Sequence, residues 1–161
     1  MANKIYAATE TPVVFQDSGG TEPITLANLA AGAGRLSDQY DRGTGSKPRL
    51  YKWRAKFAFE TAPVVSEYVE VFLAESDGTT ADAGVGASDA ALTAGQKLNL
   101  SLIGIVKVQT TDVDTGFVAS GYCLISERYF SVAVWNAAAD NLQNDANASS
   151  ITFTPVPDEI Q

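Results

Sequence analysis

The chain has 161 residues, of which 45% are hydrophobic and 19% charged, with a formal net charge of −8, one cysteine and no histidine. This length and hydrophobic content suit one domain with a sizeable core and do not indicate extended disorder. The lack of histidine excludes Ser-His-Asp and Cys-His catalysis and histidine-based zinc sites, and the single Cys123 excludes an intrachain disulfide.

The N-terminal part predicts an arm followed by short extended segments. Residues 1–12 are small and polar and lack the apolar region of a signal peptide, so we predict a docking arm there. A short apolar run at 13–15 stops at a turn cluster at 17–20. Residues 23–29 allow a strand or a short helix, and their alternation favours the strand. Between glycine-rich loops, residues 35–41 are predicted to be extended.

The run RLYKWRAKFAF at 49–59 has a period of two and predicts a strand with one apolar face and one cationic face. The apolar positions are Tyr51, Trp53, Ala55, Phe57 and Phe59, and the basic positions are Lys52, Arg54 and Lys56. Residues 67–74 are largely apolar on both parities, which predicts a strand covered on both faces over much of its length. The short connection between these two strands favours a hairpin.

The rest of the chain predicts a long loop at 75–95 and further strands. Residues 97–109 alternate and then pass Gly104, a predicted bulge or point of close approach. A turn at 110–116 follows, and the connection 136–149 allows a short helical turn. The remaining strands are predicted at 116–124, 128–135 and 150–156.

Six to eight strands separated by turns, without an amphipathic helix, predict an all-β fold. We therefore expect a single antiparallel β-sandwich domain over residues 13–161, with a jelly roll as the natural candidate.

The basic residues are concentrated in one part of the chain. The span 35–56 carries a formal charge of +5, which leaves −13 for the remainder. This layout favours self-association or docking on an acidic protein, whereas an overall pI of about 4.4 argues against nucleic-acid binding. The predicted interaction residues are Arg35, Arg42, Lys47, Arg49, Lys52, Arg54 and Lys56.

No catalytic, cofactor or metal site is predicted. The stretch DRGTGSK at 41–47 lacks the spacing of a phosphate-binding P-loop. The loop acids do not match the EF-hand spacing, and we interpret them as solvated. They are Asp77, Asp82, Asp89, Asp112 and Asp114. An enzyme that uses carboxylates alone has no visible constellation of acid, base and nucleophile, so we expect no enzyme.

Two tryptophans allow a competing hypothesis. Trp53 and Trp135 would suit a sugar-binding platform if they were exposed. Each lies on an apolar strand parity, however, which favours the core. Exposed tryptophans would indicate a carbohydrate-binding module, and buried ones would favour a structural protein.

Several phrases of the sequence together resemble small virion structural proteins of tailed bacteriophages. They are LANLAAGAGRLSDQYDRG at 26–43, YKWRAKFAF at 51–59, VEVFLAESDG at 69–78, RYFSVAVWNAAADNL at 128–142 and TPVPDEIQ at 154–161. The resemblance runs from about Glu22 to the C-terminus and implies a β-sandwich, often a jelly roll.

The resemblance implies a non-enzymatic capsid decoration protein on the outer surface of the phage head. Its expected partners are the major capsid protein or other virion proteins and further copies of itself, with a trimer favoured. The alternative is a tail or head-fibre adsorption module that binds carbohydrate. We expect synthesis in the host cytoplasm, location in the virion, and no membrane or nucleic-acid partner.

Overall fold

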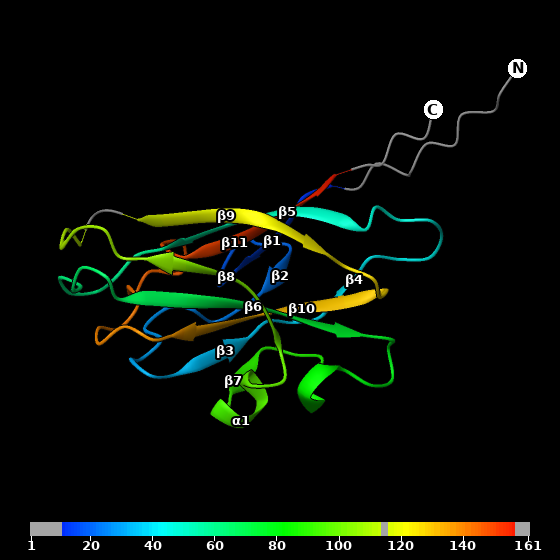
Figure 1. Cartoon of the computed structure of the whole chain (residues 1–161), viewed down its shortest axis with the longest axis horizontal. Helices are drawn as coiled ribbons and strands as arrows, with labels where there is room; N and C mark the ends of the chain where they lie inside the picture. Colours follow the sequence, from blue (N-terminus) through cyan, green and yellow to red (C-terminus); the bar gives the residue numbers. More distant parts are fainter. Residues whose placement is uncertain (1–10, 114–115, 157–161) are drawn as a thin grey trace, which may run out of the picture.

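The computed structural model describes residues 11–113 and 116–156, which form two β-sheets packed face to face (Figure 1). The predicted arm at 1–12 lies almost wholly outside these residues. The first sheet has the order β2 (Glu22–Pro23), β1 (Val13–Gln16), β11 (Ser150–Val156), β5 (Leu50–Phe57) and β9 (Phe117–Leu124). The second has the order β7 (Ala90–Leu92), β3 (Gly34–Leu36), β10 (Tyr129–Asn136), β6 (Tyr68–Ser76) and β8 (Ser101–Lys107), with β4 (Tyr40–Asp41) also paired to β10.

The strand order is that of a jelly roll. The eight main strands divide into two groups of four, ordered β1-β11-β5-β9 in the first sheet and β3-β10-β6-β8 in the second. All pairings among these eight strands are antiparallel. The prediction of an antiparallel β-sandwich is therefore confirmed, and the topology establishes the jelly roll.

An aromatic cluster fills the space between the sheets. Phe15 and Phe153 come from the first sheet and Phe130 from the second, and all three are fully buried. The Phe130 ring centre lies 5.7 Å from that of Phe15 and 5.4 Å from that of Phe153. Such edge-on and tilted contacts contribute about 0.5–1.5 kcal/mol per pair beyond area burial.

Trp53 closes one side of the core, where two glycines leave room for its indole. A Cβ atom on Gly121 of β9 would lie 2.9 Å from the indole Nε1, and one on Gly104 of β8 would overlap the ring. The register of β6 against β8 shifts between Val71 and Phe72, beside Gly104. The predicted bulge or close approach at Gly104 is therefore confirmed.

The predicted hairpin between 51–59 and 67–74 is wrong. β5 pairs with β11 and β9, whereas β6 pairs with β10 and β8 in the other sheet. The connection from β5 to β6 crosses from one sheet to the other, as most connections between the eight main strands do. A short loop gives no information about which sheet receives the next strand.

The structure also places the ends of several other predicted strands differently. Strand pairing in the region 23–29 is limited to Glu22–Pro23. The predicted strand from residue 97 begins only at Ser101, because the preceding residues form α1 (Ala94–Lys97). Thr93 caps this helix reciprocally with Gln96, a capping box that favours a helical turn. The described residues of 136–149 contain no helix, but extended structure at 35–41 is confirmed by β3 and β4.

The segment predicted as an open loop at 75–95 covers the outer face of the second sheet. It contains η1 (Asp82–Gly84), the edge strand β7 and the start of α1, and η1 and α1 lie on the side of that sheet away from β5 and β9 (Figure 1). Its side chains join residues of β3, β6 and β10 in a second apolar cluster, so the prediction that β6 is covered on both faces is confirmed. The buried members are Leu36, Phe72, Ala74, Val85, Leu92, Leu100 and Ala133.

Candidate functional site

The outer face of the first sheet carries the basic row predicted from the sequence. Lys52, Arg54 and Lys56 alternate along β5 with core residues and are exposed. Because alternate residues of a strand are spaced by about 6.8 Å, the three cations form one line. Across the described residues, none of them forms an ion pair with a carboxylate.

Apolar side chains of the edge strand β9 lie beside this row. Tyr122 lies opposite Lys52 and Val118 lies opposite Lys56. Tyr122 is 63% exposed and Leu124, at the end of the strand, is 65% exposed. On the other flank, β11 contributes the hydroxyls of Thr152 and Thr154 opposite Arg54 and Lys52. We call this surface the basic face: Lys52, Arg54, Lys56, Val118, Tyr122, Leu124, Thr152 and Thr154.

The seven predicted interaction residues fall into three separate places. Lys52, Arg54 and Lys56 lie on the basic face. Arg42, Lys47 and Arg49 line a pocket beyond the start of β5. Arg35 lies on β3 of the other sheet. The prediction grouped these seven residues because they are basic and close in sequence. Charge and sequence distance do not reveal that the chain passes from one sheet to the other between them.

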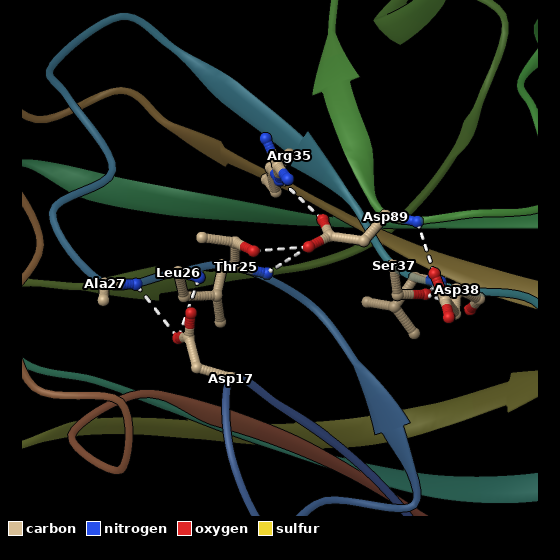
Figure 2. A network of polar contacts seen from close by, with 9 residues as sticks. Asp17, Thr25, Leu26, Ala27, Arg35, Ser37, Asp38 and Asp89 are labelled. Atoms are coloured by element: carbon tan, nitrogen blue, oxygen red, sulfur yellow. Dashed lines mark hydrogen bonds and ion pairs between the residues drawn. The ribbon is translucent and has the colours of Figure 1, made fainter.

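Arg35 belongs to a polar network that joins three segments (Figure 2). Its Nε lies 2.5 Å from Oδ1 of Asp89, just before β7. Oδ2 of Asp89 accepts hydrogen bonds from the amide of Thr25, at 3.1 Å, and from the Thr25 hydroxyl. The amide of Asp89 donates to Asp38. Asp17 accepts hydrogen bonds from the amides of Leu26 and Ala27, which follow Thr25 in the chain.

This network corrects the interpretation of Asp89 as a solvated loop acid. Its side chain is 16% exposed. Burial alone would raise the pKa of Asp89, but hydrogen bonds from Arg35 and Thr25 outweigh burial and lower it. The pKa of Glu22 is raised, by burial first and then by the nearby charge of Asp38. The arrangement fastens the covering segment to the end of the sandwich and is structural.

Asp77 and Asp82 accept hydrogen bonds from backbone amides. Asp77 accepts from the amides of Thr79 and Thr80 at 2.7 and 2.8 Å, and the bonds from Thr80 and then Thr79 lower its pKa. Asp82 accepts from the amide of Glu75 at 3.0 Å. Within residues 11–113 and 116–156 no three acidic or cysteine side chains cluster in a way that would hold a metal ion. Asp114 lies outside the described residues.

Neither tryptophan forms an open platform. Trp53 is 3% exposed. Trp135 is half-buried, and the Nζ of Lys97 lies over its ring, 4.8 Å from the centre. Sequence reasoning also overlooked the exposed aromatic Tyr122, whose position is signalled by the alternation of 116–124 between core and solvent. Each tryptophan instead completes an apolar layer.

Cys123 is half-buried and packs against the core from β9. Burial, and then the charge of Glu75, raise the pKa of its thiol to about 12. The prediction that Cys123 is a small apolar residue agrees with this environment. No helix in the part of the chain that the structure describes has the length and apolar character to cross a membrane.

Comparison with known protein families and with curated proteins finds no match to this chain. Among solved structures it is similar to a family 35 carbohydrate binding module from an environmental isolate, with a TM-score of 0.43 and 10% sequence identity. The alignment covers 96% of this chain and 90% of that chain. A likeness of this degree carries no argument about function.

Proposed function

We propose that this jelly roll is a non-catalytic docking module whose basic face binds an acidic protein surface. The observation that carries the proposal is the exposed row of Lys52, Arg54 and Lys56 on a chain with a net charge of −8. Three neighbouring cations repel one another, and a complementary anionic surface relieves that repulsion. The row therefore favours a partner of opposite charge.

The apolar flank of the basic face supplies the rest of the interface. Val118, Tyr122 and Leu124 expose large side chains beside the cations. Burying such side chains stabilises a complex by about 25 cal/mol per Å² of apolar surface, and tyrosine and arginine are common in interfaces. Nucleic acid is a poor partner, because the rest of the acidic protein repels phosphate at long range.

The setting we propose is the virion of a tailed bacteriophage, with the module decorating the capsid. The support for this setting is the resemblance of sequence phrases described above. A decoration protein needs a contact surface and no active site, which agrees with the basic face. The expected partners are the major capsid protein or another virion protein, and a trimer is the favoured assembly.

A matched pair of charge reversals tests the docking face. Arg54→Glu reverses the centre of the row, and Lys107→Glu reverses an exposed cation on β8 of the other sheet. Binding to a surface coated with poly-L-glutamate is measured by surface plasmon resonance. We expect Arg54→Glu to raise the dissociation constant about tenfold, which corresponds to about 1.4 kcal/mol, and Lys107→Glu to change it much less.

Equal weakening by the two variants would show that net charge alone drives binding and would overturn the basic face as the docking surface. Co-sedimentation with separated phage heads and tails then tests the virion setting. Binding to heads supports decoration, binding to tails supports the adsorption alternative, and binding to neither contradicts a virion role. Sedimentation velocity of the protein alone measures self-association.

The carbohydrate-binding alternative depends on exposed aromatic rings. The covered positions of Trp53 and Trp135 leave Tyr122 as the ring on the basic face. Acrylamide quenching checks this, because buried indoles are quenched slowly. Strong quenching of both tryptophans, together with saturable binding of an oligosaccharide, would favour the alternative.

A further inference from the structure

A pocket of about 360 Å³ opens at the end of the first sheet where β5 begins and β9 ends. It lies between the loop 42–49 and the turn 125–128 that joins β9 to β10. Its lining contains four basic side chains and one acidic side chain, so it is strongly cationic. The lining residues are Arg42, Gly43, Gly45, Ser46, Lys47, Arg49, Ser126, Glu127 and Arg128.

Arg42 is the buried cation of this pocket. It is 5% exposed, and its guanidinium donates to the carbonyl oxygens of Ile125 at 3.1 Å and Glu127 at 2.8 Å, and to that of Pro48. Its Nε donates to the hydroxyl of Tyr51 at 3.1 Å. All of these acceptors are neutral.

No carboxylate among the described residues pairs with Arg42. Neutral oxygens satisfy its hydrogen-bonding geometry, but they do not cancel its charge. A buried charge without a counter-ion is unfavourable, because it has lost its hydration without gaining an opposite charge. An anion in the adjoining pocket would reduce that cost.

The remaining walls add charge and shape. Arg49 is exposed at the mouth, and Lys47 extends from the same loop. Arg128 is held by a two-bond contact to Asp41, at 2.7 and 2.6 Å, so its own charge is balanced. The loop bends around the pocket through glycines at positive φ, where a side chain would be strained: Gly43 at 78° and Gly45 at 97°.

We propose that this pocket binds an oxyanion: a carboxylate, phosphate or sulfate group. The guanidinium of Arg49 provides charge-assisted donors, Lys47 adds positive charge to the lining, and the positive field of Arg42 lies behind them. The volume exceeds the roughly 30 Å³ share of one water molecule several-fold, so it admits such a group. This site is distinct from the basic face and goes beyond the proposed docking role.

The test is isothermal titration calorimetry of the full chain with inorganic phosphate, sulfate and acetate, at constant ionic strength set with sodium chloride. We expect saturable binding of at least one oxyanion, about tenfold weaker in Arg49→Gln and unchanged in the control Lys107→Gln. A tenfold loss corresponds to one charge-assisted hydrogen bond. Titration with an acetylated tetraglutamate peptide distinguishes the two sources of the anion. Tighter binding of the peptide than of phosphate indicates a protein carboxylate, and tighter binding of phosphate indicates a free anion.

Arg42→Gln removes the buried charge but also risks unfolding, so Arg42→Lys, which retains the charge, is measured beside it together with the thermal melting temperature. Lack of saturable heat with every anion would overturn the proposal, as would equal binding by Arg49→Gln and Lys107→Gln. These outcomes do not depend on docking, because Arg54→Glu changes the basic face and leaves the pocket lining intact.

Discussion

The outer faces of the two sheets differ in how they meet solvent. The second sheet is covered by the segment that carries η1, β7 and α1, whose side chains bury Phe72 and Leu36 in an apolar cluster. The first sheet exposes alternating cations beside apolar side chains of β9. One face therefore contributes to the stability of the domain, and the other is available for contacts between molecules.

The sequences of two strands already predict this difference between the outer faces. β6 is largely apolar on both parities and most of it is buried, whereas β5 alternates between core residues and cations from Tyr51 to Phe57. A strand that is apolar throughout requires a cover on each face. A strand with a charged parity requires solvent or an oppositely charged partner.

Truncating one aromatic side chain on each outer face tests this difference between the sheets most directly. Phe72→Ala on the covered face should lower the free energy of unfolding by about 3–5 kcal/mol, because it leaves a cavity under the covering segment. Tyr122→Ala on the basic face should change it by less than about 0.5 kcal/mol, because the ring is exposed. Urea unfolding measures both. Similar losses would mean that the basic face is also part of the stable core.

Asp89→Ala should loosen the cover from the end of the sandwich. It removes bonds to Arg35 and Thr25, and we expect a loss of about 1–3 kcal/mol in the free energy of unfolding, again by urea. A double-mutant cycle with Arg35→Ala tests the mechanism, because partners in one contact are not additive. Additive losses would show that the two residues act separately.

The same network predicts a pH dependence. The pKa of Asp89 is lowered on folding, so its contribution is fully present above the unfolded value of about 3.9 and is lost as pH falls through the folded value. Glu22 has a raised pKa and acts in the opposite sense, losing its contribution as pH rises through the folded value. The stability difference between the native chain and Asp89→Asn should therefore shrink between pH 7 and pH 3. A constant difference would contradict the role of the Asp89 charge.

Much of the sandwich could be predicted from local pattern. Period-two alternation located β5, because alternate side chains face opposite sides of a strand, and strands close to β9, β10 and β11 were also predicted. Gly104 was identified as a place of close approach, and the structure shows the partner to be Trp53. These features depend on a few neighbouring residues.

The features that sequence reasoning missed depend on contacts between residues that are far apart in the sequence. Nothing in residues 58–67 indicates that the chain crosses between sheets. The role of Asp89 depends on Thr25 and Arg35, which are 64 and 54 positions away. The pocket around Arg42 forms because the turn at 125–128 returns to the loop at 42–49. Such sites require the fold before they can be recognised.

The smallest expected effect concerns Cys123, which lies behind the basic face on β9 and reports whether that sheet stays closed. With a pKa of about 12, its thiolate fraction at pH 8 is on the order of one in ten thousand, and thiolate is the reactive form. We expect negligible reaction with a thiol reagent such as DTNB at pH 8 in the folded protein and rapid reaction in urea, where the pKa returns to about 8.5. Fast reaction in the folded state would show that β9 separates from its neighbour β5 in solution. That result would make the basic face a transient surface, in contrast to the covered face of the second sheet.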